Sequence, residues 1–200
     1  MGPEELLQIL SVAEKLKCST RHADTSTGRR ESVAEHSWRL ALFAMLLTNE
    51  PEFAALDMNR VIRMCLIHDL GEAFTGDIPS FEKEPVHEQR EAAAFAAWVA
   101  GFSQPTRSQF QALLAEMDAL QTPEARLYKA LDKLEAVIQH NEADISSWIP
   151  LEYALQLTYG GEQVQFSPYL QQLKSHIDRW TREKIRQAGP APGSPPDSSL

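Results

Sequence analysis

An adjacent histidine and aspartate, His68 and Asp69, end a strongly apolar segment of the chain. Burying such a polar pair beside an apolar run costs free energy unless each group has a partner. On a helical period of 3.6 residues, Glu72 shares a face with His68. One short segment therefore offers an imidazole nitrogen and two carboxylates, a set of donors that suits a divalent cation with positions left open for water and substrate.

Two further residues with metal-ligand side chains lie on the inward faces of other predicted helices. His36 begins a segment whose apolar residues continue at core spacing, and Asp132 lies at the edge of an apolar stripe. Taken alone, an inward histidine is more often a hydrogen-bonded core residue, and a helix-edge aspartate is more often solvated or ion-paired. The ordered set of His36, His68-Asp69 and Asp132 is more specific, and it predicts four side chains that meet around one cation.

Helical periodicity predicts the elements that position these residues. Ser32 and Glu35 match a capping box at the start of one helix, and Asp57 is a suitable N-cap for the next. The expected helices lie near residues 6–16, 32–47, 57–72, 85–100, 106–120, 123–143, 151–159 and 168–187. Runs of alternating β-branched residues are absent, so little or no sheet is expected and the fold class is all-α.

The remaining segments connect these helices. The polar segment 20–30 is predicted to be a loop, and Gly76 and Pro79 end the third helix. The charged turn 82–84 is expected to lie in solvent. We expect one domain over residues 1–188, followed by a disordered Pro/Gly/Ser-rich tail over 189–200. The four tryptophans are expected to be packing anchors.

Composition restricts the classes of partner. A formal net charge of -9 and the absence of a basic stripe disfavour a DNA or RNA polymer, but they allow a small anionic substrate at a metal site. The two cysteines are far apart and predict no disulfide framework. The sequence shows neither a secretory signal nor an apolar run long enough to cross a bilayer, which predicts a cytoplasmic protein without membrane contact.

Four motifs together resemble a known family. They are EHS (35–37), HDLGE (68–72), TGDIP (75–79) and KALDKLE with Asp132, and they resemble the HD-domain metal-dependent phosphohydrolases. Within that family the chain is most similar to the 5'-deoxynucleotidases, which hydrolyse deoxynucleoside 5'-monophosphates. The resemblance covers roughly residues 6–139. It implies an HD-domain helical bundle with the metal site between core helices.

The resemblance also implies roles for individual residues. One divalent cation (Mn, Co, Mg, Fe or Zn) is expected on His36, His68, Asp69 and Asp132, because additional histidine ligands for a second ion are lacking. Glu72 matches the catalytic glutamate and would orient or deprotonate the attacking water. The alternative for Glu72 is a carboxylate in solvent at a helix end.

Substrate-binding residues follow from the same resemblance. Arg21 matches the arginine that orients the phosphate, with a solvated loop arginine as its alternative and Arg29 and Arg30 as rivals. His22 departs from the tryptophan of some deoxynucleotidases and would stack on the sugar or base. The sugar is expected to contact Asp77, Ile78, Pro79 and Ser80, where the alternative is an ordinary turn. His36 and Asp69 are also expected near the substrate.

The predicted activity is hydrolysis of a (deoxy)nucleoside 5'-monophosphate to nucleoside and phosphate. The alternatives are another small phosphoester, such as a cyclic nucleotide or a guanosine polyphosphate alarmone, and a metal-bound or nucleotide-bound sensor without turnover. A helical interaction protein with a structural metal site and a two-iron oxygenase rank lower. The resemblance implies a homodimer.

Overall fold

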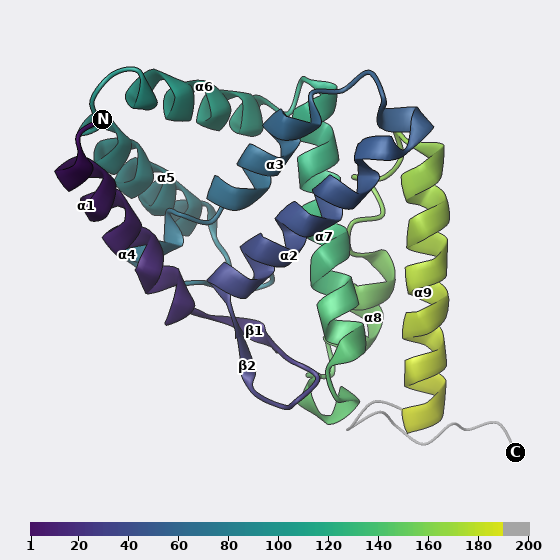
Figure 1. Ribbon diagram of the computed structural model, residues 1–200. Helices are drawn as coiled ribbons and strands as arrows, with labels where there is room; N and C mark the ends of the chain where they lie inside the picture. Colours follow the sequence, from purple (N-terminus) through teal and green to yellow (C-terminus); the bar gives the residue numbers. More distant parts are fainter. Residues whose placement is uncertain (190–200) are drawn as a thin grey trace, which may run out of the picture. The chain divides into compact units, whose positions relative to one another are not determined.

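The structure is a computed structural model that describes residues 1–189, and most of these residues are helical (Figure 1). The α-helices are α1 (Pro3–Glu14), α2 (Val33–Leu46), α3 (Met58–Ile67), α4 (Glu72–Thr75), α5 (Pro85–Ala100), α6 (Thr106–Ala119), α7 (Pro123–Glu142), α8 (Glu152–Thr158) and α9 (Pro168–Ala188). The all-α prediction is confirmed. Of the predicted disordered tail, residues 190–200 lie outside the described residues.

The chain divides into two compact units. The first comprises residues 1–22 and 30–132, and the second, among the described residues, comprises 23–29 and 133–189. Helix α7 contributes residues to both units. The prediction of one domain over residues 1–188 stays a prediction.

Helices α2 and α3 lie side by side in the first unit (Figure 1). Helix α2 begins with the predicted capping box: the Ser32 hydroxyl accepts from the Glu35 amide at 3.3 Å, and the Glu35 carboxylate accepts from the Ser32 amide at 2.9 Å. Two otherwise unpaired backbone donors are thereby satisfied. His36 lies in the first turn of this helix and is fully buried.

Helix α3 is shorter than predicted. It begins after Asp57, whose carboxylate accepts from the Arg60 amide as an N-cap, but it ends at Ile67 instead of continuing through Glu72. The Leu70 amide donates to the Ile67 carbonyl and the Glu72 amide donates to the Asp69 carbonyl, both in tighter turns than an α-helix makes. The prediction of one helix through Glu72 is therefore wrong. The chain turns at the His-Asp pair, and α4 follows as a separate helical turn.

The segment predicted as a loop contains two short strands. Strand β1 (Thr20–Asp24) pairs with β2 (Arg30–Ser32) in a two-stranded sheet, which corrects the prediction for residues 20–30. Between the strands, Gly28 has a φ of 81°, in the left-handed region that favours glycine, and its amide donates to the Thr25 carbonyl. The pairing comes from backbone hydrogen bonds rather than from an apolar alternation, so the sequence pattern did not indicate it.

The second unit has its own buried polar contacts. The Asn141 side-chain amide donates to the Thr181 hydroxyl at 2.9 Å, which joins α7 to α9. The indole of Trp148 donates to the His140 carbonyl, and Trp148 is buried as predicted. Two other tryptophans contradict the prediction of packing anchors: Trp38 and Trp180 are 63% and 42% exposed.

Among the described residues, no helix combines the length and the apolar character needed to span a membrane.

Candidate active site

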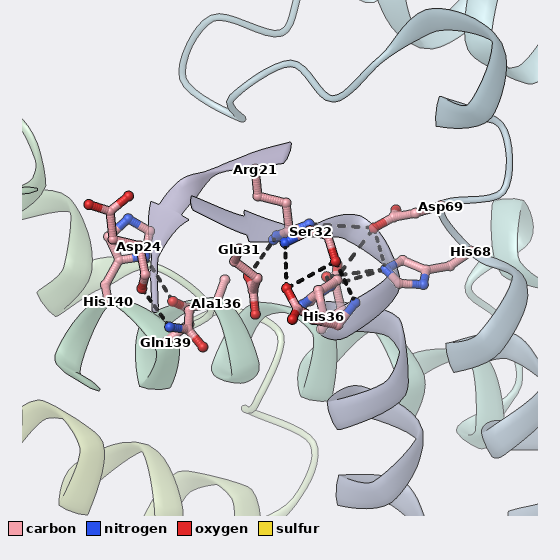
Figure 2. Close-up of polar contacts among 12 residues, drawn as sticks. Arg21, Asp24, Glu31, Ser32, His36, His68, Asp69, Ala136, Gln139 and His140 are labelled. Carbon is pink, nitrogen blue, oxygen red and sulfur yellow. Dashed lines mark hydrogen bonds and ion pairs between the residues drawn. The ribbon is translucent and has the colours of Figure 1, made fainter. Parts of the chain in front are cut away.

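The predicted metal-ligand side chains of the first unit converge. The Nε2 atoms of His36 and His68 lie 3.3 Å apart, and Asp69 Oδ2 lies 3.0 Å from His68 Nε2. Figure 2 shows these three side chains pointing toward one another from α2 and from the turn after α3. Asp132 joins them from α7, with Oδ1 at 3.3 Å from His36 Nε2 and 3.7 Å from His68 Nε2.

The hydrogen bonding of His68 leaves a lone pair at the centre of this cluster. Its Nδ1 lies 2.9 Å from the Cys65 carbonyl, which can only accept, so Nδ1 carries the proton. In a neutral imidazole Nε2 then carries the lone pair, and it faces the Nε2 atom of His36. Metal-bound histidines commonly donate their other ring nitrogen in this way.

The donor set fits a divalent cation. Neighbouring ligand atoms around an octahedral ion with bonds of about 2.1 Å lie about 3 Å apart, and the separations between the two imidazoles and from each imidazole to the two aspartates run from 3.0 to 3.9 Å. His36, His68 and Asp69 have ligand atoms that all lie within 4.8 Å of one another. Two imidazoles and two carboxylates suit several divalent metals and formally neutralise the charge of one of them. With all four side chains in the first unit, the cluster needs no contribution from the second.

Arg21 reaches the edge of this cluster from β1. Its guanidinium NH1 lies 3.4 Å from Asp69 Oδ2, and its Nε lies 3.3 Å from an oxygen of Glu31, a buried carboxylate on β2 (Figure 2). Arg21 is largely buried, which argues against a solvated loop arginine, while its rival Arg30 is exposed on β2. The strand pairing therefore aims Arg21 at the ligands.

Glu72 lies beside the ligands in an environment that disfavours its ionised form. The residue is 4% exposed, at the start of α4. Burial raises the pKa of Glu72 to about 10, and the nearby carboxylates of Asp69 and Asp77 act in the same direction. The alternative of a solvated helix-end carboxylate is thereby wrong. At neutral pH the metal-free site therefore keeps Glu72 protonated, and only its ionised form could act as a general base.

The segment after α4 lies close to the same groups. The pKa of Asp77 is raised, chiefly by burial; the positive charge of Arg21 lowers this pKa, and the negative charge of Asp69 raises it. Gly76, with a φ of 77°, ends α4 and turns the chain into Asp77–Ser80. Ile78 and Pro79 are partly buried and Ser80 is exposed. The loop therefore begins beside the metal-ligand side chains, and its contact with a sugar stays a prediction.

His22 and the charged turn each have a side-chain partner. The His22 ring packs edge-on against Phe81, with ring centroids 5.3 Å apart, so an aromatic pair joins β1 to the end of the loop. Lys83 is half-buried and its Nζ lies 2.7 Å from Glu91 Oε2 on α5, which contradicts a fully solvated turn. This ion pair ties the loop to α5.

Sequence reasoning missed three residues at this site: Glu31, Phe81 and Lys129. Glu31 holds Arg21, Phe81 packs on His22, and the Lys129 ammonium lies 3.0 Å from Asp132 Oδ2. Lys129 lies one helical turn before Asp132, and this spacing could have indicated the ion pair from the sequence. Glu31 and Phe81 gave no such signal, because their partners depend on strand pairing and on a loop path.

Comparison with known proteins identifies the family. The family model of the HD domain matches residues 13–174. The chain belongs to the HD domain family. The motif resemblance stopped near residue 139, so the HD domain match extends the family likeness well into the helical C-terminal part.

Relatives of this HD-domain chain are similar over most of their length. The human 5'-deoxynucleotidase HDDC2 is 28% identical over 96% of this chain and 94% of its own length. The Dictyostelium discoideum protein of the same name is 30% identical over 68% of this chain and 76% of its own length. These relatives confirm the prediction of an HD-domain hydrolase.

A solved structure gives the same result for the fold. A protein from Magnetospirillum magnetotacticum, described as a predicted metal-dependent phosphohydrolase, superposes with a TM-score of 0.76 at 28% identity. The match covers 94% of this chain and 95% of that one. Together with the cluster of histidines and aspartates, this likeness supports an HD-domain phosphohydrolase with a divalent metal.

Proposed function

We propose that the chain hydrolyses (deoxy)nucleoside 5'-monophosphates to nucleoside and phosphate. The observation that carries the proposal is the buried Glu72 beside convergent metal-ligand side chains, with Arg21 at their edge. A purely structural metal site needs neither the glutamate nor the arginine. The names of the relatives, all 5'-deoxynucleotidases, support the substrate class.

His36, His68, Asp69 and Asp132 would hold one divalent cation, for which Mn²⁺, Co²⁺, Mg²⁺, Fe²⁺ and Zn²⁺ are all suitable. The cation would polarise a phosphate oxygen and acidify water. Arg21 would donate to the phosphate and offset charge that builds on the transferring group. The orientation of its guanidinium by Glu31 fits this role, since the fork is held before substrate arrives.

Glu72 would transfer the proton of the attacking water to the leaving group. As a carboxylate it accepts a proton while the water oxygen forms its bond to phosphorus, and it can return that proton to the 5'-oxygen when the phosphorus–oxygen bond breaks. The raised pKa supports the second step, because a protonated Glu72 can donate to the leaving oxygen. The first step needs the ionised form, which the positive charge of a bound cation would favour.

The sugar and base would lie against the loop and the aromatic pair. Asp77 would accept from a 3'-hydroxyl, and Ile78, Pro79 and Ser80 would supply further contacts to the sugar; the proximity of Asp77 to Arg21 and Asp69 supports this. His22, backed by Phe81, would stack on the sugar or base. An imidazole is smaller than the tryptophan of some deoxynucleotidases, so ribonucleotides are expected to be tolerated better than in those enzymes.

The test is phosphate release from deoxy and ribo 5'-monophosphates in Mn²⁺, Co²⁺ and Mg²⁺, with a cyclic nucleotide and a guanosine polyphosphate in the same panel. Wild type should release phosphate from 5'-monophosphates, and Glu72→Gln should lower kcat by about 10²- to 10⁴-fold, the usual share of general acid–base catalysis. Turnover confined to the cyclic nucleotide or the polyphosphate would replace the substrate proposal. Equal turnover in Glu72→Gln would remove its assigned role.

We also propose a homodimer, as the resemblance implies. Large apolar side chains on α2 and α3 of the first unit are exposed, among them Trp38, Met45, Leu46 and Leu66. Burial of such a surface against a second copy would remove apolar area from water.

A further inference from the structure

Lys129 is separated from the predicted cation position by a single carboxylate, that of Asp132. Its Nζ is 3.0 Å from Asp132 Oδ2, whereas Oδ1 of the same carboxylate faces His36 Nε2 at 3.3 Å and His68 Nε2 at 3.7 Å. Asp132 thus has one oxygen toward the ligands and one oxygen toward the lysine. The ammonium group is held beside the metal ligands without being one of them.

The ammonium also has donors left to offer. A lysine ammonium carries three N–H groups, and one of them serves Asp132. The side chain is 32% exposed, so part of it can be reached from solvent. It lies 5.7 Å from the ring centroid of Tyr128, whose ring packs 5.8 Å from that of His68.

The charges of the neighbouring groups show what Lys129 adds to the electrostatics of the site. The positive charge of Arg21 faces two carboxylates, those of Glu31 and Asp69, at 3.3 and 3.4 Å. Asp69 and Asp132 formally neutralise a divalent cation. Lys129 therefore adds a positive charge beside a cation–ligand set that is formally neutral, whereas the other acidic groups near the site, Glu72 and Asp77, have raised pKa values that favour their uncharged forms. A phosphate dianion is attracted by the charge of Lys129.

We propose that Lys129 is a second cationic contact for the phosphate group of the substrate, held in place by Asp132. The inference rests on the proposed function, because it needs a phosphate at the metal centre. Arg21 and Lys129 reach the ligands from different elements, β1 and α7, so two cations would hold the phosphate.

A different role makes the opposite prediction for metal binding. If Lys129 only oriented Asp132, its removal would loosen a metal ligand and weaken cation binding by about 10- to 100-fold. If Lys129 contacts phosphate, its removal deletes a positive charge that repels the cation. Metal affinity would then be unchanged or higher, while phosphate affinity would fall.

The experiment measures both affinities on Lys129→Met, Lys129→Gln and Lys129→Arg. Metal-free full-length protein is titrated with Mn²⁺ and followed by electron paramagnetic resonance. Mn²⁺-loaded protein is then titrated with inorganic phosphate in a calorimeter. Lys17→Met, at an exposed lysine in the same unit, is the control for the loss of one positive charge. Circular dichroism confirms the fold of each variant.

We expect Lys129→Met and Lys129→Gln to bind phosphate about 10- to 100-fold more weakly, the range for one hydrogen bond from a charged donor. Their Mn²⁺ affinity should equal or exceed that of wild type, and Lys129→Arg should bind phosphate nearly as wild type does. Unchanged phosphate affinity, or a tenfold loss of Mn²⁺ affinity, would overturn the proposal. Both titrations work without turnover, so their result is separate from whether nucleotides are hydrolysed.

Discussion

Glu72 combines near-complete burial with two neighbouring carboxylates, those of Asp69 and Asp77. A carboxylic acid in such a place keeps its proton far above the pH at which it would lose it in the unfolded chain. Its pKa of about 10, against an ordinary value of 4.5, therefore links folding to pH. Between these values the folded metal-free protein binds a proton that the unfolded chain has released.

This linkage sets the sign of a stability prediction. Since the folded state binds more protons, the unfolding free energy falls as pH rises through this range. Glutamine cannot ionise, so Glu72→Gln should remove the loss of unfolding free energy that the buried Glu72 causes at high pH. Thermal unfolding of metal-free protein should show a melting temperature for Glu72→Gln several degrees above wild type at pH 9, with the gap narrowing toward pH 5. Glu88→Gln, at an exposed position of α5, is the control. A gap of equal size at both pH values would contradict the linkage.

Asp132 carries a second prediction at this scale. Its Oδ1 is the atom that faces both imidazoles, and asparagine keeps the shape while removing the charge. Asp132→Asn should bind Mn²⁺ at least about tenfold more weakly than wild type, since a hard cation prefers a charged oxygen ligand. Equilibrium dialysis against Mn²⁺ measures this, with Asp118→Asn, outside the site on α6, as the matched control. Equal affinities would exclude Asp132 as a ligand.

The residues that sequence reasoning found and missed differ in a physical way. His36, His68, Asp69 and Asp132 could be found because each breaks an apolar helical pattern, and such a break is visible locally. Glu31 gave no such signal, because its role depends on its partner Arg21 across a strand pair. Trp38 was misjudged for a related reason: residue type favours burial, but exposure is decided by what packs on α2.

The N-terminus of α2 positions a candidate metal ligand. Ser32 closes the capping box, and His36 follows in the first helical turn. Ser32→Ala should cost about 1 kcal/mol of unfolding free energy, the usual value of an N-cap. For a chain of this size that is a fall of about 2–4 °C in melting temperature. Ser26→Ala, at an exposed position between the strands, should leave the melting temperature near wild type. Equal shifts in the two variants would show that the capping box does not stabilise α2.

Sequence signals predicted most helices to within a few residues, because caps and prolines mark their ends. Helix α5 begins at Pro85 and α9 begins after Ser167, whose hydroxyl accepts from the Leu170 amide. The break after Ile67 could not be predicted, since no glycine or proline stands there before Gly71. His68 is the C-cap of α3, and its amide still donates to the Met64 carbonyl. The tighter turn that follows leaves His68 and Asp69 side by side in the cluster.

The whole molecule has a formal charge of -9, whereas its candidate site is proposed to attract a negatively charged phosphate. A negative surface repels a polyanion, while a buried cluster that binds a divalent cation can still attract one phosphate. The similarity to HD-domain relatives covers nearly the whole chain, including residues of the second unit. The family likeness is therefore a property of both units, although the candidate site lies in the first.

The proposed homodimer gives the prediction at this scale. Trp38 and Leu66, on α2 and α3, are 63% and 49% exposed, and a monomer would leave both in water. If they lie in the contact between two copies, Trp38→Glu and Leu66→Glu place charges in an apolar interface, which is costly without a partner. Gel filtration with light scattering should give a dimer mass for wild type and a monomer mass for both variants. Leu151→Glu, at a similarly exposed leucine of the second unit, should stay dimeric. A monomeric wild type at working concentration would remove the dimer, and a dimer that survives both substitutions would place its contact elsewhere on the chain.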